Sequence, residues 1–348
     1  MNMPTDLRAR CANLLVQAGI ATTIEDLIAC NAGGNNRTYR LTTPAGTFAV
    51  KQYFRHENDT RDRLAAEFGF LEYAAMAAPG IAPSPLSMNA ADGLALYEFV
   101  QGRAYRTGEV TRTHVEHAAR FFVALNSPAA RINAGTLPTA SEACFSISDH
   151  LAVISSRLER LRHAETASDL DLVARNLTEL IHGHWLRLAD EVVSASRKAG
   201  LDPDQPLDAT RRCVSPSDFG FHNALAQDDG SPRFLDFEYA GWDDPAKMTG
   251  DFFAQLAVPV PPDLFDGFVR QVATVNSRPE EFIVSASLLR PVYQVKWCCI
   301  ALNVFLPVNL ARRRFANPAL DEVALKEAQL AKATTLFQSI HPISHGLH

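Results

Sequence analysis

The pattern of apolar and polar positions changes character along the 348 residues of the chain. Residues 5–19 carry apolar side chains at helical spacing, and Gly19 ends this first run. Three short runs typical of β-strands follow at 24–30, 37–43 and 47–54. The tripeptide PAG joins the last two runs and is a compact hairpin signal. The start of the chain therefore predicts one helix and a small antiparallel sheet.

Longer segments complete the pattern. Residues 57–78 predict a helix, and residues 93–100 predict a further strand. The chain then reads as helical to about residue 210, returns to short strands and turns over 211–245, and is helical again after Asp251. We therefore predict an α+β protein of two lobes, with a small antiparallel-sheet N-lobe and a larger, mainly helical C-lobe.

The sequence also places the junction between these lobes. The last strand-like run of the first part ends at Gln101-Gly102. We expect residues 1–100 to form the N-terminal lobe and residues 101–348 the C-terminal lobe.

Composition narrows the class of protein. Apolar residues make up 47% and charged residues 21%, and the net charge is −6, which does not suit a general nucleic-acid binder. The six cysteines form no C-x-x-C pair, so they read as reduced thiols. No stretch approaches about 18 uninterrupted apolar residues, so we expect a cytoplasmic protein without a membrane or nucleic-acid partner.

A glycine-asparagine turn separates the first two strand-like runs. Its sequence NAGGNN contains Gly33, Gly34, Asn35 and Asn36. Glycines let the backbone approach closely, so such a turn can direct N–H groups at the phosphates of a nucleotide. A Walker A loop is absent from the sequence, and a plain hairpin turn is the commoner explanation of this segment when it is taken alone.

Lys51 stands inside the apolar run FAVKQYF. A buried ammonium needs a partner, whereas an edge-strand lysine reaches water along its aliphatic stem. If Lys51 holds nucleotide phosphates, a carboxylate on the following helix should orient it. Glu67 is the best candidate, and Glu72 is the second choice because it lies away from the centre of the apolar face.

The segment PSDFGFHN contains the tripeptide Asp218-Phe219-Gly220, which is also the magnesium-binding tripeptide of protein kinases. In that frame, a catalytic D-x-x-x-x-N should lie about fifteen residues upstream, and the sequence there contains no asparagine. Asp218 instead begins its own D-x-x-x-x-N, which ends at Asn223. Asp236 follows in the apolar run RFLDFEY. We therefore interpret Asp218 as a catalytic base, and Asn223 and Asp236 as metal ligands.

This set of residues suits phosphoryl transfer from ATP. The reaction requires Mg²⁺ on the phosphates, a lysine to neutralise charge and a carboxylate beside the acceptor hydroxyl. Mg²⁺ prefers oxygen ligands and keeps several waters, so one amide oxygen and one carboxylate suffice. Each motif also has a structural explanation when taken singly, such as an Asx turn at PSDFG. The order and spacing of the four residues together favour the chemical interpretation.

The chain resembles the aminoglycoside phosphotransferase and choline kinase-like family, whose members are small-molecule kinases with a protein-kinase-like fold. The resemblance rests on GGNNRTYRL, FAVKQY, LYEFVQG, SDFGFHNAL and FLDFEYAGWDDP…GDF, which span roughly residues 25–255. It implies that Glu98 and Val100 offer backbone groups to adenine at the hinge. It also implies ATP and Mg²⁺ as cofactors, Asp218 as the base, and structural roles for Asp244 and Asp251.

One departure from the family pattern concerns the catalytic loop. The family usually has a histidine two residues before the catalytic aspartate, and this chain has Pro216. The fixed φ of proline can take over a scaffolding role. The main alternative to an active kinase is therefore a catalytically impaired nucleotide-binding regulator. A protein kinase is a lesser alternative, because no A-P-E segment follows Asp236.

The acceptor is a small molecule whose charge the sequence leaves open. Residues 142–208 carry 12 Asp and Glu against 7 Lys and Arg, which suits either an amine-bearing acceptor or a solvated surface. Arg312–Arg314 suit an anionic acceptor, although a basic helix end is the commoner explanation. Tyr293 and Trp297 share a helix face and would stack on a sugar or pack in the core, while His222 carries no evident role. The oligomeric state is not predicted.

Overall fold

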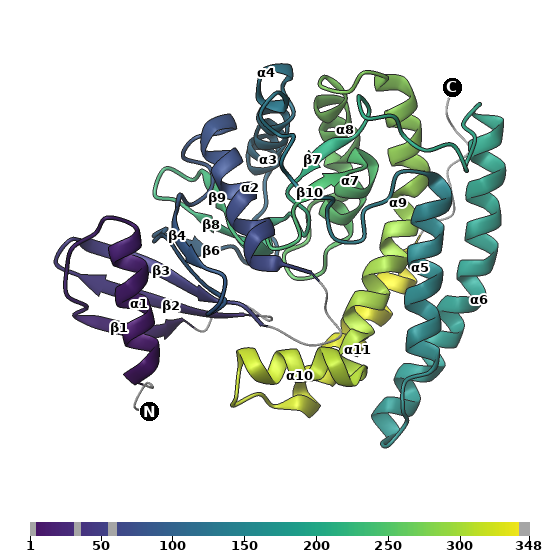
Figure 1. Ribbon diagram of the computed structural model, residues 1–348. Coiled ribbons are helices and arrows are strands. Elements are labelled where there is room, and N and C mark those ends of the chain that lie inside the picture. Colours follow the sequence, from purple (N-terminus) through teal and green to yellow (C-terminus); the bar gives the residue numbers. More distant parts are fainter. Residues whose placement is uncertain (1–4, 31–35, 55–60, 341–348) are drawn as a thin grey trace.

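A computed structural model describes residues 5–30, 36–54 and 61–340. The N-terminal lobe is built on an antiparallel sheet with the strand order β1-β2-β3-β5-β4. Its strands are β1 (Asp26–Cys30), β2 (Arg37–Thr43), β3 (Gly46–Gln52), β4 (Pro85–Asn89) and β5 (Leu94–Glu98). Figure 1 shows this sheet on one side of the molecule and the helical lobe on the other.

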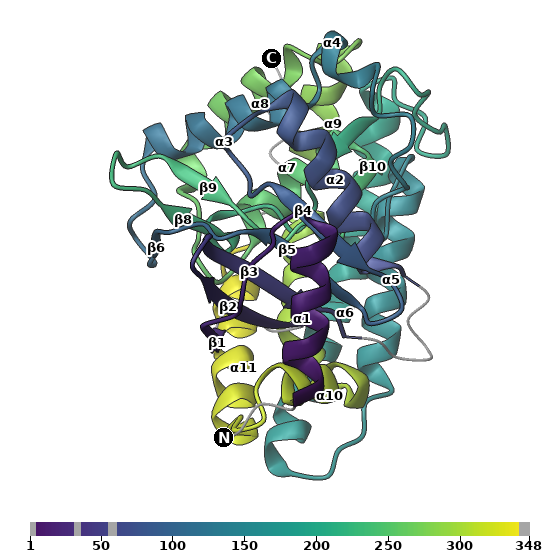
Figure 2. The same ribbon diagram turned by 60° about the vertical axis from the view of Figure 1, so that its left-hand side comes forward.

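The two faces of the sheet differ because side chains alternate along each strand. Leu41, Val50 and Leu96 point to the outer face, where helix α1 (Thr5–Gln17) covers them with Leu14 and Leu15. Figure 2 shows α1 lying across this face. The opposite face carries the alternate residues, including Lys51, and is turned toward the helical lobe. The sequence therefore places Lys51 at the boundary between the lobes.

Helix α2 (Arg63–Ala77) lies between the sheet and the rest of the molecule. The predicted helix at 57–78 begins later than expected because Asp62 caps it, accepting a hydrogen bond from the Ala65 N–H at 2.9 Å. Residues 55–60 lie outside the described part of the chain. Glu67 is buried on the inner side of α2 next to Phe68.

The C-terminal lobe is mainly helical, as predicted. Two small sheets are inserted in it: β6 (Arg103–Ala104) with β8 (Ala224–Ala226) and β9 (Pro232–Phe234), and β7 (Cys213–Ser215) with β10 (Gly241–Asp243). The helices are α3 (Arg112–Leu125), α4 (Pro128–Arg131), α5 (Ile147–Arg162), α6 (Asp169–Lys198), α7 (Pro245–Ala254), α8 (Phe265–Ala273), α9 (Pro279–Leu302), α10 (Pro307–Ala316) and α11 (Glu322–Gln338). Among the described helices, none is by itself long and apolar enough to cross a membrane. The segments Pro279–Phe305 and Pro307–Ala316 are long and apolar enough for a membrane span only when they are taken together, and the chain bends by 76° between them.

Helices α7 and α9 pack closely through a glycine. A Cβ atom added at Gly250 would lie 2.3 Å from Cδ2 of the Tyr293 ring. Tyr293 cannot move aside easily, because it is fully buried and its hydroxyl is 2.5 Å from Nδ1 of His150. The contact fixes the distance between α7, which follows the site strands, and the central helix α9.

We expect Gly250→Ala to lower the free energy of unfolding by about 1–3 kcal/mol, because the overpacking cost exceeds the gain in helix propensity of about 1 kcal/mol. Urea unfolding followed by circular dichroism measures this change. Gly267→Ala in α8 is the matched control, since nothing lies within 4 Å of the added Cβ there. The control should be neutral or stabilising, and equal behaviour of the two variants would contradict the close-packing explanation.

Candidate active site

Three distant segments bring charged side chains together on the inner side of the sheet. Lys51 of β3 contacts two carboxylates: its Nζ is 2.6 Å from Oε2 of Glu67 and also donates to Oδ1 of Asp236. The structure therefore pairs Lys51 with Glu67, whereas Glu72 is exposed on the outer side of α2. Asp236 lies just after β9, so the cluster joins the two lobes.

The cluster is buried and closely bonded. Burial lowers the pKa of Lys51, but Asp236, Glu67 and Glu238 outweigh it and hold the pKa well above its usual range. Burial raises the pKa of Glu67 and Asp236 adds to this rise, while Lys51 opposes it. The Tyr53 hydroxyl donates to Glu67 at 2.7 Å. Lys51 is thus charged at neutral pH and held between two carboxylates.

Asp218 and Asp236 both adopt unusual backbone conformations. The φ angle is +42° at Asp218 and +65° at Asp236, and Ser217 has a φ of +45°. These angles lie in the left-handed region, which aspartate tolerates better than most residues and serine less well. Strained backbone of this kind is concentrated at functional sites, where the surrounding structure holds it in place. Periodicity in the sequence does not predict such angles.

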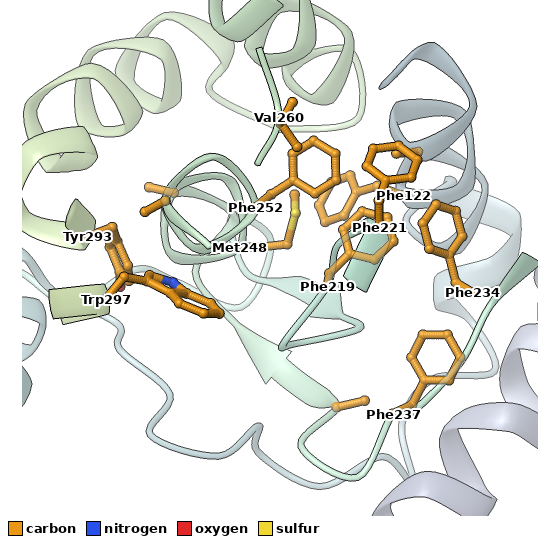
Figure 3. Close-up of a cluster of buried hydrophobic side chains, with 14 of the residues drawn as sticks. Phe122, Phe219, Phe221, Phe234, Phe237, Met248, Phe252, Val260, Tyr293 and Trp297 are labelled. Atoms are coloured by element: carbon orange, nitrogen blue, oxygen red, sulfur yellow. The ribbon is translucent and has the colours of Figure 1, made fainter. Parts of the chain in front are cut away.

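Aromatic side chains hold the loop that carries Asp218. Phe219 and Phe221 alternate with Asp218 and Gly220, and both rings enter the core (Figure 3). The Phe219 ring centroid is 4.7 Å from that of Phe234 and 5.2 Å from that of Phe252. The phenylalanine of the kinase-like tripeptide is therefore a packing anchor. With Pro216 also buried, these contacts support the loop without the usual histidine.

Phe219→Ala should destabilise the protein by about 3–5 kcal/mol, as expected for the loss of a buried phenylalanine. It should also lower the rate of a reaction that depends on Asp218 by up to roughly 10²-fold in the folded protein, because Asp218 loses its support. Turnover should be measured at a temperature where the variant is folded by circular dichroism. Phe282→Ala, in α9 away from the loop, supplies a comparable core deletion, and an equal loss of rate there would contradict the anchoring role.

The amide of Asn223 is oriented by the same loop. Its Nδ2 donates to the Asp218 carbonyl oxygen at 3.0 Å and lies 3.4 Å from Asp218 Oδ2. In the described part of the chain, no hydrogen bond to the Asn223 amide oxygen or to the second carboxylate oxygen of Asp236 is formed. One amide oxygen and one carboxylate oxygen are the donors that suit Mg²⁺, so these residues fit the predicted metal role.

His222 is a site residue that the sequence did not single out. Its Nε2 lies 3.2 Å from Oδ1 of Asp218, and its ring meets the Trp297 ring edge-on with centroids 6.1 Å apart. In the sequence, His222 stands four residues after Asp218, and in a loop this spacing does not predict that the two side chains meet. The contact places His222 beside the candidate base, where it orients one carboxylate oxygen.

The glycine-asparagine turn is described only at its last residue. Gly33, Gly34 and Asn35 lie outside the described residues. Asn36 is buried, and its Nδ2 donates to Glu238 Oε2 at 2.5 Å while its Oδ1 accepts from the Phe54 N–H at 3.0 Å. Glu238, two residues after Asp236, was also not predicted. It links the end of the turn to the segment that carries Asp236.

The segment between the lobes borders two hollows. The smaller, of about 350 Å³, is lined by Arg40, Thr47 and residues 99–102, and so includes Val100. Its size suits part of a nucleotide. The larger, of about 740 Å³, lies on the C-lobe side of Gln101-Gly102 and is not bordered by Lys51, Asp218 or Asp236. The smaller hollow is the one that shares the inner sheet face with Lys51.

Val100 lines the smaller hollow, whereas Glu98 forms contacts between the two lobes. Its backbone N–H donates to the Ser84 carbonyl oxygen at 2.9 Å. Its carboxylate forms a two-point pair with Arg233 of β9, at 2.6 and 2.9 Å. The hydrogen bond from Arg233 lowers the pKa of Glu98, and burial, which raises the pKa, offsets only part of this shift. Glu98 therefore ties the N-lobe to the C-lobe.

Other residues considered in the sequence support the fold. Asp244 caps α7, accepting from the Ala246 N–H at 2.7 Å, and Asp251 pairs with Lys296 at 2.8 Å. The Trp297 indole N–H donates to Asp251 at 2.9 Å, and both Trp297 and Tyr293 are buried (Figure 3). The two aromatic residues are thus part of the core.

Comparison with known proteins shows which family the chain belongs to. The profile described as the phosphotransferase enzyme family matches residues 26–271, which is most of the chain. The chain belongs to the phosphotransferase enzyme family. The match includes every candidate site residue named above, from Asn36 to Asp236. No curated protein sequence matches the chain.

Solved structures of phosphotransferases share the fold. A choline/ethanolamine kinase family protein from Mesorhizobium loti is 20% identical, with a TM-score of 0.58 over 96% of this chain and 94% of that one. A choline kinase from Cryptosporidium parvum is 12% identical, with a TM-score of 0.57 over 97% of each chain. Spectinomycin phosphotransferase, solved with ADP and spectinomycin, is 11% identical, with a TM-score of 0.54 over 95% of this chain and 98% of that one. The predicted two-lobed, protein-kinase-like fold is confirmed.

Proposed function

We propose that this phosphotransferase is an ATP-dependent kinase that moves the γ-phosphoryl group of Mg-ATP to a hydroxyl of a small molecule. The observation that carries the proposal is the contact of Lys51 with Glu67 and Asp236. The loop of Asp218 and Asn223 lies beside this contact, because the Asn223 carbonyl oxygen accepts a hydrogen bond from the N–H of Leu235 at 2.8 Å. Membership of the family supports the reaction class. The ADP bound to the spectinomycin phosphotransferase supports a nucleotide as the donor.

In this proposal each residue has a defined task. Lys51, positioned by Glu67, neutralises the donor phosphates. Asp218 orients the acceptor hydroxyl and takes its proton while the acceptor oxygen bonds to the γ-phosphorus. The bond from that phosphorus to the bridging oxygen breaks, and ADP leaves with the bonding electrons. Asn223 Oδ1 and Asp236 would hold Mg²⁺, which offsets phosphate charge when it is bound.

The nucleotide is assigned to the lobe of residues 1–100 and the hinge, and the acceptor to the lobe of residues 101–348. Gly33, Gly34, Asn35 and Asn36 are proposed to cover the phosphates, and Glu98 and Val100 to border the base.

A nucleotide-binding regulator is the second candidate, favoured only by Pro216. The left-handed backbone at Ser217 and Asp218 argues against this alternative, because strained backbone of this kind is concentrated at functional sites. The aromatic contacts described above hold the loop in this conformation.

The test is ADP release from Mg-ATP across sugars, sugar acids, sugar phosphates, amino alcohols and aminoglycosides. Acceptor-dependent release, with phosphate recovered on the acceptor by mass spectrometry, is the expected result. Binding of Mg-ATP without stimulation by any acceptor would favour the regulator. Absence of nucleotide binding by calorimetry would overturn the whole proposal.

A further inference from the structure

The two oxygens of the Asp218 carboxylate have different surroundings. Oδ1 lies 3.2 Å from Nε2 of His222, whereas Oδ2 has a longer contact of 3.4 Å with Nδ2 of Asn223. That amide forms its shorter hydrogen bond, of 3.0 Å, with the Asp218 backbone carbonyl oxygen. Among the described residues, His222 is therefore the main partner of the carboxylate, and it contacts one oxygen.

The surroundings of the His222 ring determine which nitrogen carries the proton. An ionised carboxylate only accepts hydrogen bonds, so the nitrogen that faces Asp218 must be protonated. The other nitrogen, Nδ1, is buried and has no hydrogen-bond partner in the described part of the chain. A proton on Nδ1 would leave a buried N–H group without an acceptor, which is costly. The single ring proton therefore belongs on Nε2, where it is donated to Asp218.

The ring fits beside Asp218 because residue 220 is a glycine. A Cβ atom added at Gly220 would lie 2.8 Å from Nδ1 and 3.0 Å from Cε1 of His222. The φ angle of Gly220 is 168°, an extended conformation that any residue adopts, so the glycine is required by the lack of space and not by its backbone. The glycine of the kinase-like tripeptide thus makes room for an imidazole next to the candidate base.

Helix α9 provides a further contact to the ring. The Trp297 ring meets His222 edge-on, with centroids 6.1 Å apart. Trp297 is itself fixed, because its indole N–H donates to Asp251 at 2.9 Å and Asp251 pairs with Lys296 at 2.8 Å. These side chains are buried, and Figure 3 shows Trp297 next to Tyr293 in the core. The packing therefore holds the His222 ring in one orientation.

We propose that His222 is a positioning residue for Asp218, which holds Oδ1 so that Oδ2 is the oxygen that accepts the proton of the acceptor hydroxyl. This inference rests on the proposed kinase function and names how its base is oriented. Phe219 and Phe221 hold the backbone of the loop, whereas His222 acts on the carboxylate itself. A carboxylate without this partner can rotate, and a misplacement of about 1 Å costs up to roughly 10²-fold in rate.

The hydrogen bond can be tested without turnover. Nuclear magnetic resonance of protein labelled with ¹⁵N-histidine reports which ring nitrogen carries the proton, and the His222 signal is identified by its absence from His222→Gln. We expect the proton on Nε2, with slow solvent exchange in the wild type and fast exchange in Asp218→Ala. Gly220→Ala should also give fast exchange, because the added Cβ displaces the ring. A proton on Nδ1, or exchange that Asp218→Ala leaves unchanged, would overturn the inference.

Turnover distinguishes positioning from a general loss of structure. With the best acceptor, His222→Leu should lower kcat roughly 10- to 100-fold while the KM for ATP stays within about twofold, because Lys51 and Asp236 are intact. His222→Gln keeps an N–H donor and should recover most of this loss. His163→Leu is the matched control and should leave kcat unchanged, since Nε2 of this exposed histidine also contacts a carboxylate four residues away, that of Glu159 at 2.7 Å.

Resonance and turnover together separate this inference from the kinase proposal. A normal kcat for His222→Leu in an active enzyme would overturn the positioning role and leave the kinase proposal standing. Equal losses in His222→Leu and His222→Gln would also overturn it, because the N–H donor would then have no effect. Absence of ADP release with every acceptor, together with an Nε2 proton that depends on Asp218, would sink the kinase proposal and uphold the contact of His222 with the carboxylate.

Discussion

Asp218→Asn is expected to lower kcat by roughly 10²–10⁴-fold, the range attributed to a positioned general base. The amide keeps the size of the side chain but cannot accept the hydroxyl proton. The Asn223 contact to the Asp218 backbone carbonyl is independent of the replaced group, so the loop should keep its shape. Steady-state turnover with the best acceptor measures the loss.

Two controls make this result specific. Asp190→Asn, on the exposed surface of α6, should leave kcat unchanged. Binding of Mg-ATP to Asp218→Asn should match the wild type in calorimetry, because Lys51 and Asp236 are intact. If Asp218→Asn retains most of its kcat, Asp218 is not the general base. If the variant loses nucleotide binding, Asp218 acts in binding the phosphate donor.

Lys51→Met is expected to lower the free energy of unfolding by about 3–5 kcal/mol at neutral pH, because it leaves the buried Glu67 carboxylate without its counterion. The deficit should depend on pH. Burial already raises the pKa of Glu67, and losing Lys51 raises it further. The folded variant then holds a proton that the unfolded chain releases above about pH 4.5. The stability of Lys51→Met therefore falls, relative to wild type, as pH rises from 5 to 8.

A double variant separates stability from function. Lys51→Met with Glu67→Gln removes the uncompensated charge and should recover most of the stability while ATP turnover stays lost. Urea unfolding at pH 5 and pH 8 provides the measurement, and Glu72→Gln is the control on the same helix. If the double variant is no more stable than Lys51→Met, the ion pair with Glu67 is not the source of the deficit.

The two-lobed fold was predictable because its evidence is local. Alternation and helical spacing identified the strands, α1 and the long helices, and the order of Lys51, Asp218, Asn223 and Asp236 followed a known chemistry. The pairing of Lys51 with Glu67, not Glu72, also followed from which side of α2 is apolar.

Contacts between distant segments were not predictable in the same way. Glu238 meets Asn36 across 202 positions, and the left-handed backbone at Ser217 depends on the fold around it. His222 acquires its role only when the loop turns its ring toward Asp218. Tyr293 and Trp297 share a face, but only packing decides that this face points inward.

The lobes are joined at both ends of the sheet, and this bears on how the enzyme releases its product. Strand register sets Glu98 opposite Phe48 and Arg37 opposite Gln52, four positions further along β3. Glu98 is bound to Arg233 at the first end, and Arg37 to Phe315 at the second. A rotation that moved the lobes apart about the hinge would therefore break the second contact, between Arg37 and Phe315. If the protein is the kinase proposed above, opening of the lobes to release ADP would first break the contact of Arg37 with Phe315.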